Sequence, residues 1–160
     1  MDEFVSIITV NYNGKGFLKD FLNSTRALEY PKGNFEVIVV DNASTDDSVR
    51  FIKKEFPEVK IVQSEINLGF GRGNNLGMKK ARGSLFFLVN NDTVLSRDAL
   101  KKIVDCHKRW SKKFKVGAVN AKMVLFDKYT PVVVRGARFV EYKVPDEAVP
   151  KSNTPFLFVH

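Results

Sequence analysis

The stretch SLFFLVNNDTVLSRDAL, residues 84–100, decides the fold. Five apolar residues run directly into Asn90, Asn91 and Asp92, and a segment with helical spacing follows. An apolar run of this length predicts a strand that is buried on both faces of a sheet. Such a strand would deliver three polar side chains to one edge of that sheet.

Upstream of this stretch, short apolar runs alternate with segments of helical spacing. Strands this apolar, separated by helices, predict an α/β fold with a mainly parallel sheet that helices cover on both faces. At 160 residues, of which 44% are hydrophobic, the chain is expected to form one domain with a substantial core. Strands are expected at 4–10, 35–40, 59–63 and 85–89, and helices at about 17–28, 44–56, 71–81 and 97–114.

Local signals place the ends of some of these elements. Ser44 is followed three positions later by Asp47, which resembles a capping box, so we expect the second helix to begin near Ser44. Phe17 continues the apolar face of the first helix. Beyond residue 116 we expect strands at 116–126, 131–136 and 137–142, and a proline-rich loop at 143–155.

Composition disfavours several classes of function. One cysteine, Cys106, and two histidines cannot supply an internal disulfide or a zinc-ligand set. The first residues carry acids rather than a basic leader, and no apolar stretch approaches the roughly 20 residues that span a bilayer. We therefore expect a soluble, cytoplasmic protein. A single glutamine among many lysines and glutamates is a bias consistent with a hyperthermophile.

Polar residues follow each of the four expected strands. Parallel strands end at the same edge of a sheet, and in open α/β sheets ligands bind in the crevice beyond that edge. Asn, Asp and Gly also favour loops and caps, so each cluster taken alone is better explained by structure. Four polar ends on one edge together favour a binding site. They comprise Asn11, Tyr12 and Asn13, then Asp41 and Asn42, then residues 67–75, and finally Asn90, Asn91 and Asp92.

The glycine-rich segment NLGFGRGNN, residues 67–75, does not match two common phosphate-binding patterns. Its spacing is not that of GxGxxG, and it follows the third strand, whereas a dinucleotide fingerprint follows the first. The pattern GxxxxGK[ST] does not occur in the sequence. Dinucleotide binding and P-loop hydrolysis are therefore disfavoured.

Four motifs occur along the first two thirds of the chain: VSIITVNYNG, EVIVVDNASTDDSV, NLGFGRGNNLGMKKARG and FLVNNDT. Together they resemble the nucleotide-binding half of a family 2 glycosyltransferase of the GT-A fold, and they are most similar to its rhamnosyltransferase-like members. The resemblance covers residues 4–105. It implies a Rossmann-like sheet in a single domain, residues 1–160, whose part 106–160 holds the end of a basic helix and extra strands.

The resemblance implies roles in a site for a nucleotide-diphosphate sugar. It places Asn11 and Tyr12 in the base pocket and makes Asp41 the acceptor of a hydrogen bond from the base. Uracil and thymine offer the same edge to that carboxylate, so a UDP- or dTDP-sugar is expected. Arg72 and Asn75 would approach ribose and phosphate. Two structural explanations stay open: Asp41 could cap the turn that follows it, and Arg72 could be a solvated arginine.

The family's metal-binding DxD motif corresponds to Asn90, Asn91 and Asp92. The resemblance implies that Asp92 binds Mn²⁺ or Mg²⁺ and that Asn91 belongs to the nucleotide-sugar site. Independent chemistry agrees, because a divalent ion neutralises the charge that develops on a departing diphosphate. Since Asn90 replaces the first acid, free metal should bind weakly and together with the nucleotide. A cap or Asx turn is the structural alternative for Asp92.

The resemblance implies transfer of a sugar, with inversion, to a glycan or lipid-linked acceptor in cell-surface polysaccharide biosynthesis. An inverting member needs a carboxylate base, which the family supplies in an acidic segment well downstream of the metal motif. No acidic residue after Asp92 stands in a matching context, so the base is not identifiable. We therefore expect a truncated, split or diverged member that binds better than it transfers; a non-catalytic nucleotide-sugar-binding module is the alternative.

The basic excess of the chain lies in its last third. Residues 1–100 hold 13 basic and 13 acidic residues, whereas residues 101–160 hold 13 basic and 5 acidic ones. Between 97 and 114, apolar side chains share one helical face and basic side chains the other. A solvated basic face is the simplest explanation, and docking to anionic lipid at the inner membrane face is the functional one. Nucleic-acid binding is less favoured, because no recognition motif accompanies the charge.

Overall fold

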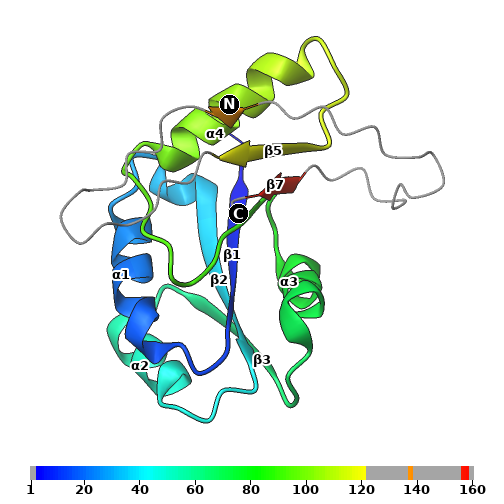
Figure 1. The fold of residues 1–160 in the computed structure, drawn as a ribbon. Helices are drawn as coiled ribbons and strands as arrows, with labels where there is room; N and C mark the ends of the chain where they lie inside the picture. Colours follow the sequence, from blue (N-terminus) through cyan, green and yellow to red (C-terminus); the bar gives the residue numbers. More distant parts are fainter. Residues whose placement is uncertain (1–2, 122–136, 139–155, 159–160) are drawn as a thin grey trace.

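The computed structural model describes residues 3–121, 137–138 and 156–158 (Figure 1). The helices and strands in this part of the chain are β1 (Val5–Asn11), α1 (Lys15–Arg26), the 3-10 helix η1 (Lys32–Asn34), β2 (Phe35–Asn42), α2 (Ser48–Glu55), β3 (Lys60–Ser64), α3 (Gly69–Lys80), β4 (Leu85–Leu88), α4 (Ala99–Ser111), β5 (Ala118–Ala121), β6 (Ala137–Arg138) and β7 (Phe156–Phe158).

The strands form one sheet in the order β3-β2-β1-β4-β7-β5-β6. All neighbouring pairs are parallel except β5 with β6. Strand β1 lies between β2 and β4, and it pairs along its whole length with β2, from Val5 opposite Phe35 to Asn11 opposite Asp41. On its other side, β1 pairs with β4 from Val5 opposite Leu85 onward. The predicted α/β fold with a mainly parallel sheet is confirmed.

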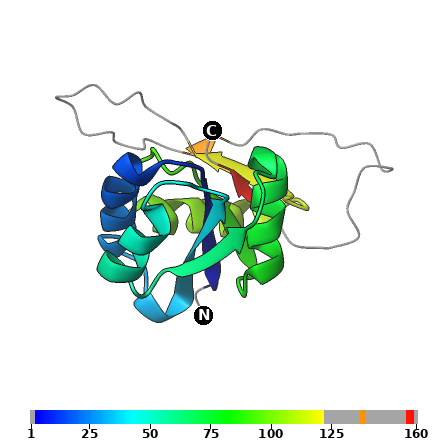
Figure 2. The same ribbon diagram turned by 90° about the horizontal axis from the view of Figure 1, so that it is seen from below.

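Successive residues of the strands face two different cores, because side chains alternate between the faces of a sheet. Ile7 belongs to the larger core, which α1, α2 and α4 cover. Ile8 belongs to the smaller core, against which Leu76 of α3 packs. Figure 2 shows α1 and α2 on one side of the sheet and α3 on the other. Covering helices on both faces explain why the strands are apolar without alternation.

Two glycines let α3 approach the sheet closely. A methyl group at Gly73 would lie 2.9 Å from Val10 Cγ1, and one at Gly77 would lie 2.5 Å from Ile8 Cγ2. Both glycines are buried and lie four positions apart, which places them on the same face of the helix. The glycine-rich composition of this segment therefore has a packing reason.

The strands and helices expected upstream of residue 115 are present, with different ends for some of them. α3 begins at Gly69, and α4 spans Ala99–Ser111 rather than 97–114. Phe17, which continues the apolar face of the first helix in the sequence, is 58% exposed in the structure and lies outside the core. Of the expected downstream strands, 116–126 is described only to Ala121 and 137–142 only to Arg138. The expected strand 131–136 and loop 143–155 lie outside the described residues.

Replacing Gly77 with alanine tests the close packing of α3. The new methyl group would meet Ile8 Cγ2 at 2.5 Å and Val40 Cγ2 at 2.9 Å, so overpacking should lower the free energy of unfolding by about 1–3 kcal/mol. Gly71→Ala is the matched control, since a methyl group there has no heavy atom within 4 Å. Its better helix propensity should raise stability by about 0.5–1 kcal/mol. Urea denaturation measures the unfolding midpoint of both variants. Equal midpoints for Gly77→Ala and Gly71→Ala would contradict the close packing of α3 at Gly77.

Candidate functional site

The carboxyl ends of β1, β2, β3 and β4 lie at one edge of the sheet, because these four strands are parallel. Figure 1 shows the loops that follow β1, β2 and β3 together at its lower end. The register places Asp41 between Asn11 on one side and Gln63 on the other. The polar strand ends identified in the sequence therefore approach one edge from neighbouring strands.

Asn11, the last residue of β1, joins two of these strand ends. Its side chain is fully buried. Its Oδ1 accepts a hydrogen bond of 2.8 Å from Asn91 Nδ2, and its Nδ2 donates one of 3.1 Å to Ser44 Oγ. The predicted site residues Asn11 and Asn91 are thus brought together. The loop after β4 is connected to the loop after β2 through the end of β1.

The capping box expected at Ser44 was wrong. The helix α2 begins at Ser48, and its N-cap residue Asp47 makes no side-chain capping hydrogen bond. The Ser44 hydroxyl instead accepts hydrogen bonds from Asn11 Nδ2 and, at 3.0 Å, from the Asn13 N–H. Ser44 therefore stabilises the end of β1 rather than the start of a helix.

Two non-glycine residues in these loops have a left-handed backbone: Asn13, with φ 51°, and Ala43, with φ 66°. Asn13 is stabilised there because its Oδ1 accepts hydrogen bonds from the N–H groups of Thr45 and Asp46, at 2.7 and 3.3 Å. The side chain of Ala43 cannot make such hydrogen bonds, so its left-handed conformation costs on the order of 1 kcal/mol. Backbone strain of this kind clusters at functional sites, so Ala43 supports a functional edge.

Asp46 connects the loop after β2 to the start of α1. Its carboxylate accepts hydrogen bonds from the Lys15 N–H at 3.1 Å and from the Ser48 N–H at 3.0 Å. Burial by itself would raise the pKa of Asp46, but the hydrogen bonds from Ser48 and Lys15 outweigh it and lower this pKa. The carboxylate is thus held ionised as part of the loop framework.

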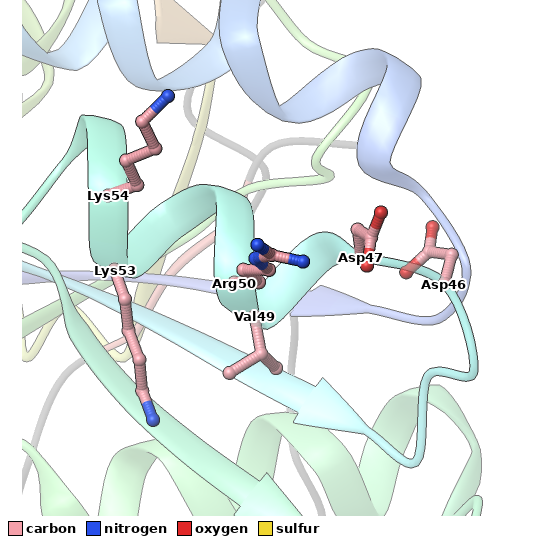
Figure 3. A pocket seen from close by; sticks show the side chains of 6 residues that line it. All are labelled: Asp46, Asp47, Val49, Arg50, Lys53 and Lys54. Carbon is pink, nitrogen blue, oxygen red and sulfur yellow. The ribbon is translucent and has the colours of Figure 1, made fainter.

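A surface depression runs along α2 and carries charges of both signs (Figure 3). The carboxylate of Asp47 at one end forms a 3.3 Å ion pair with Lys15. None of the predicted site residues lines this depression, although Asp46 of the loop after β2 does. Its lining consists of Asp46, Asp47, Val49, Arg50, Lys53 and Lys54.

Asp41 lies near the end of β2 and is only 3% exposed. One oxygen, Oδ2, accepts a long hydrogen bond of 3.4 Å from the Ser44 N–H, as expected of a residue that caps the turn. The other oxygen, Oδ1, is buried and has no hydrogen-bond partner among the described residues, and the same holds for the hydroxyls of Thr9 and Ser48. A buried acceptor without a donor is costly, so Asp41 has capacity for one more hydrogen bond.

Asn42 and Asn67 connect β2 to α3; both belong to the polar strand ends identified in the sequence, but neither was given a role in binding the nucleotide sugar. Asn42 Nδ2 donates to Asn67 Oδ1 at 2.9 Å, and Asn42 Oδ1 accepts from the Leu68 N–H at 2.9 Å. Asn67 Oδ1 also accepts from the Gly69 N–H at 2.8 Å. These bonds hold the N-terminus of α3 beside the end of β2. In the sequence, the only indication of this connecting role is that each asparagine follows an expected strand.

Three predicted site residues present their side chains to solvent. Tyr12 is 52% exposed, and Arg72 and Asn75 are exposed near the start of α3. Arg72 Nε donates to the Leu68 carbonyl at 3.1 Å, and within the described residues its guanidinium has no acidic partner. The guanidinium is therefore accessible to an anion such as a phosphate.

Asp92 follows β4 on the loop that Asn91 attaches to Asn11. It is exposed, and within the described part of the chain it makes no hydrogen bond or ion pair. No group of three or more His, Cys, Asp or Glu that could hold a metal ion occurs among the described residues. One free carboxylate fits a hard divalent cation whose other ligands are water and phosphate oxygens. It does not fit an ion held by protein ligands alone.

The family of this protein follows from its match to known sequences. Residues 6–147 match the family described as Glycosyl transferase family 2. The chain belongs to this family. Its resemblance to family 2 glycosyltransferases, inferred from the four motifs, is thereby confirmed.

Relatives of this chain include enzymes named for poly(ribitol-phosphate) and for poly-N-acetylglucosamine. The chain is 33% identical over 99 residues to the poly(ribitol-phosphate) beta-N-acetylglucosaminyltransferase TarS of Staphylococcus aureus, which covers 60% of this chain and 17% of that protein. It is 31% identical over 120 residues to a poly-beta-1,6-N-acetyl-D-glucosamine synthase of Staphylococcus epidermidis, covering 74% of this chain and 28% of the relative.

Solved structures of similar proteins have the same fold. A crystal structure of S. aureus TarS in complex with UDP-GlcNAc has a TM-score of 0.64 at 28% identity, covering 78% of this chain and 35% of that one. The mannosyltransferase PcManGT from Pyrobaculum calidifontis, in complex with GDP-Man and Mn²⁺, has a TM-score of 0.65 at 25% identity, covering 76% and 35%. The GT-A fold is confirmed, and the chain spans 35% or less of the length of these relatives.

The basic face of α4 lies away from this edge. Lys101, Lys102 and Arg109 are exposed, whereas Leu100 and Val104 are buried in the larger core. Figure 1 shows α4 at its upper end, opposite the loops that follow β1, β2 and β3. None of the helices in the described part of the chain combines the length and the apolarity needed to cross a membrane.

Proposed function

We propose that this chain provides the nucleotide-binding part of an inverting glycosyltransferase that binds a nucleotide-diphosphate sugar together with Mn²⁺ or Mg²⁺. Membership of family 2 supports the general activity. The observation that supports the site most directly is the hydrogen bond between Asn91 and Asn11. It attaches the loop that carries the free carboxylate of Asp92 to the strand end that carries the exposed ring of Tyr12.

The residues divide into a base side and a phosphate side. On the base side, Tyr12 offers an exposed aromatic face, and Asp41 offers a buried oxygen that lacks a donor among the described residues. On the phosphate side, Arg72 and Asn75 are exposed at the start of α3, and Asp92 would hold the cation. A donor whose base and diphosphate reach both sides fits this division.

The proposed reaction exchanges one bond at the anomeric carbon for another. The bond to the diphosphate oxygen breaks, and a bond to the acceptor oxygen forms on the opposite face of the sugar. A divalent cation bound at Asp92 would neutralise the charge developing on the diphosphate. Arg72 would add a second positive charge beside the phosphates. The acceptor's proton would pass to a carboxylate base, a role that we assign to none of the described residues.

The nucleotide and acceptor are proposed by class. Uracil and thymine carry an N–H that could donate a hydrogen bond to the Asp41 carboxylate, so we propose a UDP- or dTDP-sugar. One structural relative is in complex with UDP-GlcNAc. A glycan or lipid-linked acceptor is supported by relatives named for poly(ribitol-phosphate) and poly-N-acetylglucosamine. Because no base is assigned, a module that binds the donor without transferring it is the second candidate.

We also propose that residues 1–160 form one domain, and that the basic face of α4 can contact an anionic membrane from the cytoplasmic side. The exposed lysines of that helix support such a contact, since each is worth about 1 kcal/mol near an anionic surface. Nucleic-acid binding has no comparable support, because the phosphate-side residues are better suited to a nucleotide sugar.

Asp92→Ala should remove the dependence of nucleotide binding on metal. Without the carboxylate, the affinity for UDP measured by calorimetry should be the same in Mn²⁺ as in EDTA, with an unchanged unfolding midpoint. Asp105→Ala is the matched control, because Asp105 is an exposed carboxylate on α4 with no proposed role in nucleotide binding. If Asp92→Ala keeps the gain in affinity that Mn²⁺ gives the unaltered protein, the assignment of the metal ligand fails.

Asp41→Asn should change the preference among bases. The carboxylate accepts a hydrogen bond from the N–H of uracil, whereas cytosine presents an acceptor at the same position, so the unaltered protein should prefer UDP to CDP. The variant should lose about 1–3 kcal/mol of affinity for UDP and little for CDP. Competition calorimetry measures both affinities. Equal losses for the two nucleotides would mean that Asp41 only caps the turn.

A further inference from the structure

We propose that Asn11 is a positioning residue that fixes the loop carrying Asp92, and that its own side chain does not contact the nucleotide. This inference rests on the proposed function, because its consequence is measured in metal-dependent nucleotide binding. It gives Asn11 a role different from that of a residue lining the base pocket.

The side chain of Asn11 is fully buried, and both of its polar ends are occupied within the protein. The carboxamide oxygen accepts from Asn91 Nδ2, and the carboxamide nitrogen donates to Ser44 Oγ. Because Asn11 is fully buried, a ligand could reach its side chain only if the groups that cover it moved away. The side chain is therefore suited to joining the loops on either side of it.

The loop after β4 has few other attachments. Of residues 90–94, only Asn91 makes a side-chain hydrogen bond to another segment of the described chain. The next attachment is the Leu95 N–H, which donates to Ser24 Oγ at 3.1 Å. The side chain of Asp92 has no partner in the described residues, and the Thr93 N–H closes a turn around it by donating to the Asn90 carbonyl at 3.2 Å. The Asn91–Asn11 bond is the nearest side-chain attachment of this turn to another segment of the described chain.

Gly14 provides the space for this bond. It precedes α1 with φ −105° and ψ 24°, a conformation that does not require glycine. A methyl group at Gly14 would lie 2.4 Å from Asn91 Nδ2 and 2.6 Å from Asn11 Oδ1, which are the two bonded atoms. The absence of a side chain at Gly14 is thus explained by the bond rather than by the backbone.

A single carboxylate ligand makes this positioning important. Metal binding at one protein ligand depends on the diphosphate for its remaining contacts, so a displaced Asp92 loses the shared ion. Disrupting the Asn91–Asn11 bond should therefore weaken binding in Mn²⁺ and leave metal-free binding nearly unchanged. If Asn11 only stabilised the fold, disrupting its bond would weaken nucleotide binding equally in Mn²⁺ and without metal.

The test is calorimetry of UDP binding, in Mn²⁺ and in EDTA, to the full chain and four variants. The variants are Gly14→Ala, Asn91→Ala, their combination, and the control Gly16→Ala, where a methyl group has no heavy atom within 4 Å. Gly14→Ala should weaken binding in Mn²⁺ by about tenfold and binding in EDTA by no more than about twofold, and Asn91→Ala should weaken binding in Mn²⁺ by about tenfold. The double variant should be no weaker than Asn91→Ala, because both changes disrupt one bond.

Wild-type affinity in Gly14→Ala, equal losses with and without Mn²⁺, or additive losses in the double variant would each overturn the positioning role alone. Failure of the unaltered protein to bind either UDP or dTDP, in Mn²⁺ or in EDTA, would instead overturn the proposed function, and this inference with it. If circular dichroism shows that Gly14→Ala does not fold, Asn11→Ser replaces it in the same cycle. That change shortens the side chain and removes its bonds to Asn91 and Ser44 without adding volume.

Discussion

The parallel pairing of β1 with β2 on one side and with β4 on the other is the constraint on which the site depends. It gives Asn11, Asp41 and Asn91 a common edge, although Asn11 and Asn91 are 80 positions apart in the chain. Apolar side chains on both faces fix the register of these strands, because a shift of the pairing by one residue would move each side chain of a strand into the opposite core. The close approach of α3, which Gly73 and Gly77 permit, completes the second core.

Much of this framework could be predicted from the sequence, because apolar runs and helical spacing directly report burial. The exceptions are positions where local patterns compete with tertiary contacts. Ser44 has the spacing of a helix cap, but the end of β1 uses its hydroxyl. Phe17 fits an apolar helix face, yet it points to solvent. The short strand β7, which pairs with β4, was not predicted, because three residues carry too little periodicity.

The candidate site could be predicted by residue type and by edge, but not by which side chains touch one another. Asparagines follow several strands, and the sequence alone does not say which of them meet a ligand and which bind each other. The structure separates them by burial: Asn11 and Asn42 are buried and hydrogen-bonded through both the amide nitrogen and the amide oxygen, whereas Asn75 is exposed. Buried asparagines and a small Gly14 thus form a support beneath the exposed residues of the proposed site.

The most direct test of the account is a crystal structure of the protein with UDP-GlcNAc and Mn²⁺, in which anomalous scattering locates the ion. The account predicts the ion in direct contact with the Asp92 carboxylate and with both phosphates of the nucleotide. It also predicts an intact Asn91–Asn11 hydrogen bond beneath them. An ion bound away from Asp92, or a nucleotide bound away from the carboxyl ends of β1 and β4, would contradict it.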